Sequence, residues 1–220
     1  MNQTNRFGTF GTCIAVALAV YAAIASLAEL ARPDYRTTDV FLNRSPPVGG
    51  NVSLARVAAS ISFDGDLLAN YAATKAAEAF QRPALDAKSR MEQFKKAEGA
   101  GITALKVSPI RPALWLALGT LRAQSNEPVA PVLKMSYLSG WVPTDLAFFR
   151  VQAATSTSAA SDEEIRLLAQ SDIRSVLANR SRFEASLIAA YVQATPQGRS
   201  LLLEATQVID PKFNEMLRRY

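Results

Sequence analysis

Histidine is absent from this 220-residue chain, and cysteine occurs only once, as Cys13. The lack of imidazole excludes Ser/His and Cys/His nucleophilic sites and histidine metal centres within the chain. A single cysteine can form neither an intrachain disulfide nor a zinc site made of several thiolates. We therefore expect a protein without a metal, a cofactor or catalytic residues, whose composition suits binding better than chemistry.

Charge is also modest, since 20% of the residues are charged and 49% are hydrophobic. This balance excludes wholesale disorder, and the length suits one domain with a short appendage. The sequence predicts three parts: a membrane anchor or signal segment over residues 1–30, a Pro/Gly-containing linker over residues 31–52, and a helical domain over residues 53–220.

No charged residue occurs in the run from Phe7 to Ala28. As a helix this run is about 33 Å long, which is enough to cross the hydrocarbon core of a bilayer. Its most apolar part, Ile14 to Ile24, also has the length of the apolar region of a secretory signal, and small residues follow that fit signal cleavage. Two interpretations stay open: an uncleaved anchor through residues 7–28, or a cleaved signal.

The charges on the two sides of this run predict its orientation. Arg6 and the α-amino group precede it, whereas the charges of Glu29, Arg32, Asp34 and Arg36 beyond it nearly cancel. Positive charge favours the cytoplasmic side. We expect a single-pass protein of a bacterial inner membrane with its C-terminal domain in the periplasm, or a secreted periplasmic protein if the segment is cleaved.

Proline and glycine gather in the expected linker, at Pro33 and in the stretch Asn43–Asn51. They predict a semi-rigid spacer that leaves the membrane. Beyond it the hydrophobic period is helical almost everywhere, and no sustained alternation of period two occurs. Several helix starts carry capping signals, among them Ser161 to Glu164, Thr195-Pro196 and Asp210-Pro211. The predicted fold class is all-α, with helical runs over about 84–107, 112–124, 128–140, 144–155, 162–178, 181–194, 198–209 and 211–219.

Three prolines of the helical part are separated by multiples of one interval. From Pro109 to Pro143 it is about 34 residues, the length of a common helical repeat unit, and Pro211 lies two such intervals beyond Pro143. The missing member of this series would be at Leu177. A large apolar residue follows six positions after each of the four places, at Trp115, Phe149, Phe183 and Leu217. The clearest copy also has Leu118-Gly119 after its tryptophan, with small residues on the preceding helix at Ala97 and Ala104.

This pattern resembles the tetratricopeptide repeat, a helix–turn–helix unit of the same length. The resemblance covers about residues 78–145 and implies a superhelical stack of helix pairs with a concave groove for peptides or chain-like ligands. Later units depart from it, because Gln152-Ala153 and Ser186-Leu187 stand where Leu-Gly belongs. An irregular helical bundle is the alternative. The repeat-defining residues are Ala97, Ala104, Pro109, Trp115, Leu118, Gly119, Pro143, Phe149, Phe183 and Pro211.

Paired acids offer the only catalytic hypothesis, an enzyme that cleaves envelope glycans. The candidates are Asp64 with Asp66, Glu92 with Glu98, and the acids of residues 162–164. We interpret them as caps and solvated charges instead. Gly99, Gly101 and Ala104 have the spacing of a dinucleotide-binding loop but follow a helical run rather than a strand, so that fingerprint is not expected to apply.

Basic residues give the remaining indication of a partner. They gather in two regions, and the net charge of +5 belongs to residues 31–220. Such a surface suits anionic polysaccharide, lipid headgroups or an acidic protein, whereas export excludes nucleic acid as a partner. The two groups are Lys88, Arg90, Lys95 and Lys96, and then Arg174, Arg180, Arg182, Arg199, Arg218 and Arg219.

The stretch Leu133–Gly140 loosely resembles repeat domains that accompany bacterial exopolysaccharide or O-antigen machinery. This resemblance implies protein partners in the cell envelope. The first hypothesis is therefore a non-catalytic, membrane-anchored helical-repeat protein that scaffolds or regulates an envelope assembly, such as polysaccharide biosynthesis or export. The alternatives are the carboxylate-dependent glycan enzyme and a small structural subunit of a membrane complex.

Overall fold

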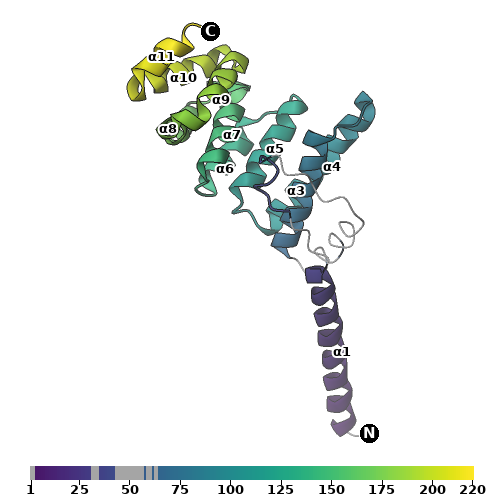
Figure 1. Cartoon of the computed structure of the whole chain (residues 1–220). Coiled ribbons are helices and arrows are strands. Elements are labelled where there is room, and N and C mark those ends of the chain that lie inside the picture. Colours follow the sequence, from purple (N-terminus) through teal and green to yellow (C-terminus); the bar gives the residue numbers. More distant parts are fainter. Residues whose placement is uncertain (1–2, 31–34, 43–56, 58–60, 62–63) are drawn as a thin grey trace.

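The computed structural model describes residues 3–30, 35–42, 57, 61 and 64–220. All regular structure within these residues is helical, which confirms the all-α prediction. The elements are α1 (Gln3–Leu30), α3 (Gly65–Gln81), α4 (Ala87–Val107), α5 (Pro112–Gln124), α6 (Ala130–Leu138), α7 (Thr144–Thr155), the 3-10 helix η1 (Ser158–Ser161), α8 (Glu163–Ala178), α9 (Arg180–Gln193), α10 (Pro196–Ile209) and α11 (Pro211–Leu217) (Figure 1).

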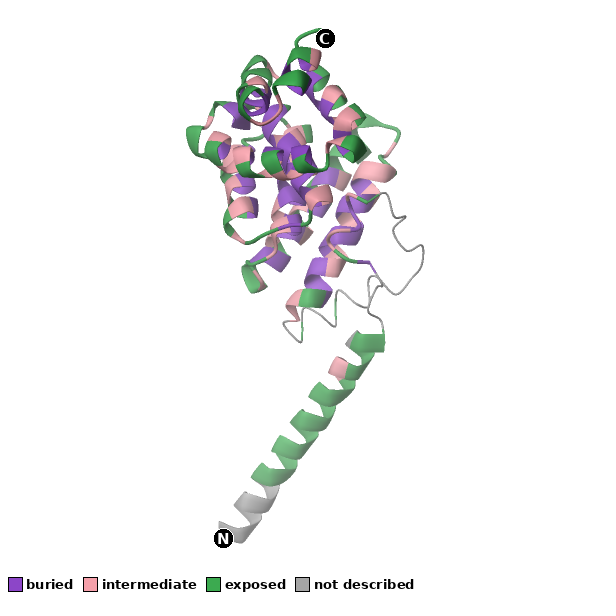
Figure 2. Cartoon of the chain, turned by 60° about the vertical axis from the view of Figure 1, so that its left-hand side comes forward, coloured by how far each residue is buried: buried purple, intermediate pink, exposed green. Residues whose placement is uncertain are grey.

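Helix α1 extends away from the helical body (Figure 1) and exposes nearly all of its described surface (Figure 2). Its segment Phe10–Leu27 is long and apolar enough to cross a membrane, and Leu18 is 63% exposed. A continuous apolar surface of this kind is rare on a protein surrounded by water. The segment therefore has the properties of a membrane anchor or of a signal sequence.

Local side-chain caps define where several helices begin. Asp64 accepts hydrogen bonds from the backbone of Asp66 and Leu67 at the start of α3, and Thr195 and Asp210 cap α10 and α11. These caps satisfy backbone N–H groups that have no partner within the helix. The prediction for α8 was one residue off: Asp162, not Ser161, caps that helix, because Ser161 ends η1.

Neighbouring helices pack on one another along the chain from α3 to α11. Alternate helices also meet, so that α3, α5, α7 and α9 form one row of contacts and α6, α8 and α10 form a second. The row α3–α5–α7–α9 is the part of the fold that positions the site described below.

The residue composition of the core differs along the molecule. In α3 the buried face is made mostly of alanine, and it packs against α4 and α5. From α7 onwards the core is built from leucine, isoleucine, valine and phenylalanine, with Ile165, Ile173 and Leu201 fully buried.

Residues 35–42 lie within the expected linker, yet they pack on the helical body. Tyr35 and Val40 are buried in the same cluster as the alanines of α3, and the Asp39 carboxylate accepts a hydrogen bond from the Arg36 backbone at 2.9 Å. Phe41 contacts Phe149 of α7, with 5.2 Å between ring centroids. The rest of the predicted linker, 31–34 and 43–52, lies outside the described residues.

Candidate functional site

A groove of about 680 Å³ runs along one side of the domain. None of its lining residues is charged, although 43 of the 220 residues are Lys, Arg, Asp or Glu. The lining comes from residues 35–42, from α3, α5, α7 and α9, and from the turn between α7 and η1. It consists of Val40, Phe41, Phe80, Gln81, Thr120, Ala123, Gln124, Phe149, Gln152, Ala153, Ser156, Thr157 and Gln193.

Four glutamines enter the groove from four different helices. Gln81, Gln124 and Gln193 are the last residues of α3, α5 and α9, and Gln152 lies in the last turn of α7. Gln81 hydrogen-bonds Tyr35, whose pKa burial raises to about 12. The side chains of the other three make no hydrogen bond to any residue that the structure describes. Each therefore has a free donor group and a free acceptor group.

Phenylalanine rings form the apolar side of the groove. The rings of Phe41 and Phe149 are in contact and tilted by 39°, and Phe148 meets Phe149 edge-on at 5.5 Å. Phe148 in turn stacks on the buried Phe183 at 5.7 Å. The aromatic contacts thus lead from the groove into the core, and these packed rings fix the groove wall in place.

Most of the repeat-defining residues hold the helices together and do not line the groove. Trp115 donates from its indole Nε1 to the carbonyl oxygen of Pro109 at 2.7 Å, which ties the start of α5 to the preceding turn. Four of these residues are buried on α4 or α5: Ala97, Ala104, Leu118 and Gly119. Pro143 and Pro211 lie at the starts of α7 and α11, and Phe183 is in the core. Only Phe149 lines the groove.

Gly119 is less constrained than the repeat pattern implies. A Cβ at this position would meet Val129 Cγ1 at 3.7 Å, which is ordinary van der Waals contact. Alanine therefore fits there, and close helix approach at this site does not require glycine.

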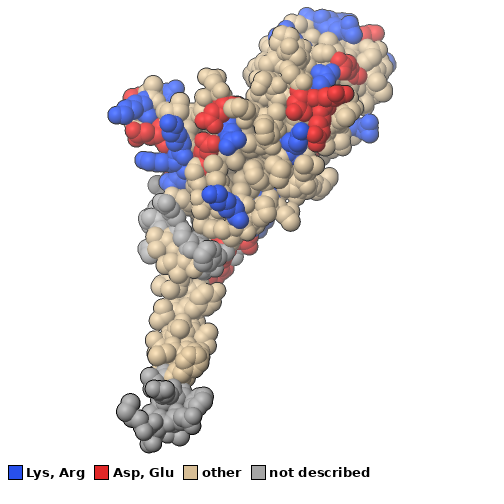
Figure 3. All heavy atoms as spheres, turned by 180° about the vertical axis from the view of Figure 1, so that it is seen from behind, with Lys and Arg blue, Asp and Glu red and all other residues tan. Residues whose placement is uncertain are grey.

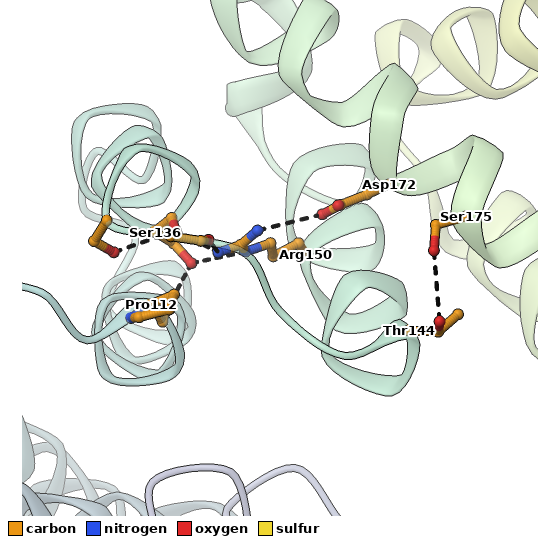
Figure 4. A network of polar contacts seen from close by, with 8 residues as sticks. Pro112, Ser136, Thr144, Arg150, Asp172 and Ser175 are labelled. Carbon is orange, nitrogen blue, oxygen red and sulfur yellow. Dashed lines mark hydrogen bonds and ion pairs between the residues drawn. The ribbon is translucent and has the colours of Figure 1, made fainter.

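A buried polar network joins α5, α6, α7 and α8 (Figure 4). Arg150, only 3% exposed, donates from Nε to Ser136 Oγ at 3.0 Å and from Nη2 to the carbonyl oxygens of Ser136 and Gly140. Ser136 Oγ donates to the Pro112 carbonyl at 2.7 Å. Gly140 has φ +146°, a conformation that favours glycine, and this turn aims its carbonyl at Arg150.

Asp172 and Tyr137 also belong to this network, but their side chains are not fully hydrogen-bonded. Asp172 Oδ2 lies 3.8 Å from Arg150 Nη1, and the Tyr137 ring lies under the guanidinium, with 4.7 Å between centroid and Cζ. The Tyr137 hydroxyl faces the Asp172 carboxylate, but neither that hydroxyl nor Asp172 Oδ2 makes a hydrogen bond of good geometry with a described residue. Burial raises the pKa of Asp172 to about 6 and raises the pKa of Tyr137, because both are poorly solvated.

The acids of the catalytic hypothesis are spread over the fold and have other contacts. Asp64 caps α3, Asp66 pairs with Arg111, and Glu98 pairs with Arg122 at 3.0 Å. Asp162 caps α8, where Glu164 also pairs with Lys134 at 2.6 Å. Glu92 lines a different pocket, between α3 and α4, with lysines beside it. Gly99 and Gly101 lie inside α4, so they do not form a loop at a helix start.

Basic side chains gather at the outer end of α4, and on the rest of this face cations and anions are interspersed (Figure 3). Several of the predicted basic residues are paired: Arg180 with Asp210 at 2.9 Å and Arg182 with Asp145 at 2.6 Å. No group of three or more potential metal-ligating side chains occurs among the described residues.

Comparison with protein-family models, with curated proteins and with solved structures finds no match for this chain. Sequence reasoning missed the groove glutamines, although Gln152 stands out in the sequence as a departure from the repeat pattern. The available signal was their place at the ends of predicted helical runs, as for Gln124 at the end of 112–124. What the sequence lacked was evidence that these ends meet.

Proposed function

We propose that the protein is a non-catalytic, membrane-anchored helical-repeat protein, whose domain lies in the bacterial periplasm and scaffolds or regulates a cell-envelope assembly. The observation that carries this proposal is the contrast between α1 and the rest. An exposed apolar helix is joined to a domain that has its own core and an open, uncharged groove. Such an arrangement holds a binding surface near a membrane.

The helix contacts support a repeat-like arrangement of the domain. Helices α5 and α6, α7 and α8, and α9 and α10 are three successive pairs, and the first and second members of these pairs contact their counterparts in the next pair. Tetratricopeptide-like stacks have this connectivity, and they commonly bind other proteins. The contacts of the candidate acids argue against the enzyme hypothesis, because Asp64 and Asp162 cap helices, whereas Asp66 and Glu98 form ion pairs.

Site-specific labelling tests the proposed topology. Cys13 is the only cysteine, so Cys13→Ser gives a background without thiols into which Val208→Cys or Asn5→Cys is introduced. Val208 is 85% exposed on α10, so this thiol is open to reagent. A membrane-impermeant maleimide should label Val208→Cys in cells with a permeabilised outer membrane, and Asn5→Cys only after lysis. The reverse pattern would overturn the periplasmic assignment.

The mass of the purified protein distinguishes an anchor from a cleaved signal. An intact N-terminus means that α1 stays in the membrane. Loss of about the first 28 residues would instead make the mature protein a soluble periplasmic one.

In-cell crosslinking of the tagged full-length protein, followed by capture and mass spectrometry, tests the scaffold role. Recovery of a polysaccharide polymerase, ligase or export component supports it and identifies the process. Replacement of residues 1–30 by an unrelated anchor serves as the matched control: a scaffold domain tolerates the exchange, whereas a subunit that acts through its membrane helix loses function.

A further inference from the structure

Resting on the proposed function, we propose that one end of the helical domain lies on the surface of the membrane that α1 spans. Four apolar side chains on two neighbouring turns enter the interfacial layer of lipid headgroups. These residues, Val107, Ile110, Leu138 and Trp141, form the turn surface.

The two turns lie side by side at the end of the domain where α3 begins. Arg111, just before α5, pairs with Asp66 in the first turn of α3. A Cβ on Gly140, in the turn before α7, would meet Pro112 Cγ at 3.9 Å, and Ser136 Oγ donates to the Pro112 carbonyl at 2.7 Å. The turn between α4 and α5 therefore connects the start of α3 with the turn between α6 and α7.

The turn surface presents large apolar side chains to solvent. Trp141 is 84% exposed, Ile110 77% and Leu138 61%, and Val107 is exposed as well. Single exposed apolar residues are common on proteins, but several on two adjoining turns mark an interaction surface.

Buried contacts hold Trp141 in this exposed position. On one side, Arg150 Nη2 donates to the Gly140 carbonyl at 3.0 Å, and on the other, Val142 belongs to the core. The backbone of this turn is therefore already fixed, so that contact with a partner surface orders little additional chain.

The two tryptophans of the chain differ in the state of their indole N–H groups. Trp115 is half-buried, and its Nε1 donates to the Pro109 carbonyl. The Trp141 indole makes no hydrogen bond to any residue that the structure describes. An apolar ring with an unpaired N–H suits the boundary between hydrocarbon and water, where membrane proteins concentrate tryptophan.

The connection to α1 is too short to hold the domain far from the bilayer. Four residues separate Leu30, the last residue of α1, from Tyr35, which is buried against α3. A chain of this length reaches at most about 18 Å. In Figures 1 and 2 the end of the domain next to α1 is the end where α3 begins. The turn surface thus lies on the side from which α1 enters the membrane.

Charges at this end of the domain are compatible with lipid headgroups. Asp66 pairs with Arg111, and Asp145, in the first turn of α7, pairs with Arg182 at 2.6 Å. Lys106 is exposed in the last turn of α4. A lysine stem lies along apolar surface while its ammonium group stays in the polar layer, so this residue also fits the interface.

A protein is the competing occupant, because exposed apolar surface also marks contacts between proteins. The short connection favours lipid, since it keeps the turn surface beside the bilayer in every molecule. The observations therefore favour the bilayer.

Quenching of tryptophan emission by brominated lipid tests the proposal. The full-length protein is reconstituted into vesicles of zwitterionic phosphatidylcholine whose acyl chains carry bromine near the headgroup, so that basic residues gain little attraction. Trp115→Phe leaves Trp141 as the only tryptophan, because the chain has two. Relative to unbrominated vesicles its emission should fall about twofold, and it should lie at shorter wavelength than that of a tryptophan in water, as expected for an interfacial tryptophan. The difference between the wild type and Trp141→Phe gives the same quantity without altering Trp115.

Val208→Trp in the double variant Trp115→Phe/Trp141→Phe is the matched control. Val208 is as exposed as Trp141 but lies on α10, at the other end of the domain from α1 (Figure 1). Its emission should be almost unaffected by brominated lipid. A melting curve for each variant shows that the fold is retained.

Two results would overturn the proposal. Emission of Trp141 that matches the control means that the turn surface faces water, and emission at short wavelength without quenching means that a protein covers it. Flotation of the same vesicles reports whether α1 anchors the chain. Protein that floats without quenching contradicts this inference alone, whereas protein that does not float contradicts the anchor and with it this inference.

Discussion

Helices α3 and α8 both bury one face, but they do so with different side chains. Helix α3 buries six alanines among its nine buried residues, whereas α8 buries Ile165, Ile173, Val176 and Leu177 around a single alanine. Alanine contributes little apolar area and loses no side-chain entropy, so its benefit depends on how closely the helices approach. Large aliphatic side chains instead gain stability from the area that they remove from water. The two regions should therefore respond in opposite ways to removing and to adding volume.

The largest effect is expected where α10 meets the end of α7. A Cβ on Gly198 would lie 2.0 Å from the carbonyl oxygen of Thr155, which is backbone and cannot turn away. Gly198→Ala should lower the free energy of unfolding by about 4 kcal/mol or more, which is a large share of the stability of an ordinary domain.

Gly101→Ala is the matched change in the alanine-rich region, because the new Cβ would meet only Leu118 Cδ1 at 3.9 Å. It should raise stability by about 0.4–1 kcal/mol. Urea unfolding of the full-length protein in detergent measures both. Equal effects of the two substitutions would contradict the structure.

Shortening a buried side chain should lower the free energy of unfolding more in the aliphatic region around α8 than in the alanine-rich α3. Ile173 is fully buried, so Ile173→Ala should cost about 3 kcal/mol through lost burial and the cavity left behind. Ala73→Gly, at a fully buried position of α3, should cost only about 1 kcal/mol, which is the difference in helix propensity. The same unfolding curves report both, and a larger cost for Ala73→Gly would refute the comparison.

Added volume should harm the alanine-rich α3. Ala73→Leu adds volume between closely packed helices and should cost about 2 kcal/mol, more than the volume-conserving control Ile173→Leu in α8, which should cost less than about 1.5 kcal/mol. Thermal unfolding followed by circular dichroism gives the ranking. If α3 accepts leucine without loss, its alanines are not needed for close approach.

A pH-dependent effect concerns Asp172 in α8, a polar exception in the aliphatic region. Its pKa is raised to about 6 in the folded protein from an ordinary 3.8, so the folded state binds this proton more tightly than the unfolded state does. The contribution of Asp172 to stability therefore improves as pH falls from 7 to 4 and worsens as pH rises through 6.

Asp172→Asn removes this titration. Relative to the variant, the wild-type chain should gain about 2 kcal/mol between pH 7 and pH 4. Urea unfolding of both proteins at the two pH values checks the difference. The opposite sign would mean that the pairing with Arg150 dominates over burial.

Local sequence signals predicted the helices well. The run 112–124 has the same bounds as α5, and 144–155 the same bounds as α7, since proline or a capping group marks each start. Of the candidate site, the repeat resemblance implied only a concave groove and did not identify the residues that line it. Phe149 belongs to it, whereas Trp115 and Phe183 pack elsewhere.

Long-range contacts decided the rest. Arg150 is a charged residue in a helical run, and nothing in the local sequence shows that the carbonyls of Ser136 and Gly140 will surround it. Likewise, Gln81, Gln124, Gln152 and Gln193 follow no constant spacing, so no period could bring them together.

The sequence by itself determined the helical class, the helix starts and the apolar N-terminal segment, because periodicity, caps and hydropathy act over a few residues. The tertiary structure alone decided which helix ends meet, and with them the uncharged groove and the buried Arg150. These features depend on contacts between residues tens of positions apart, which form only when the helices pack.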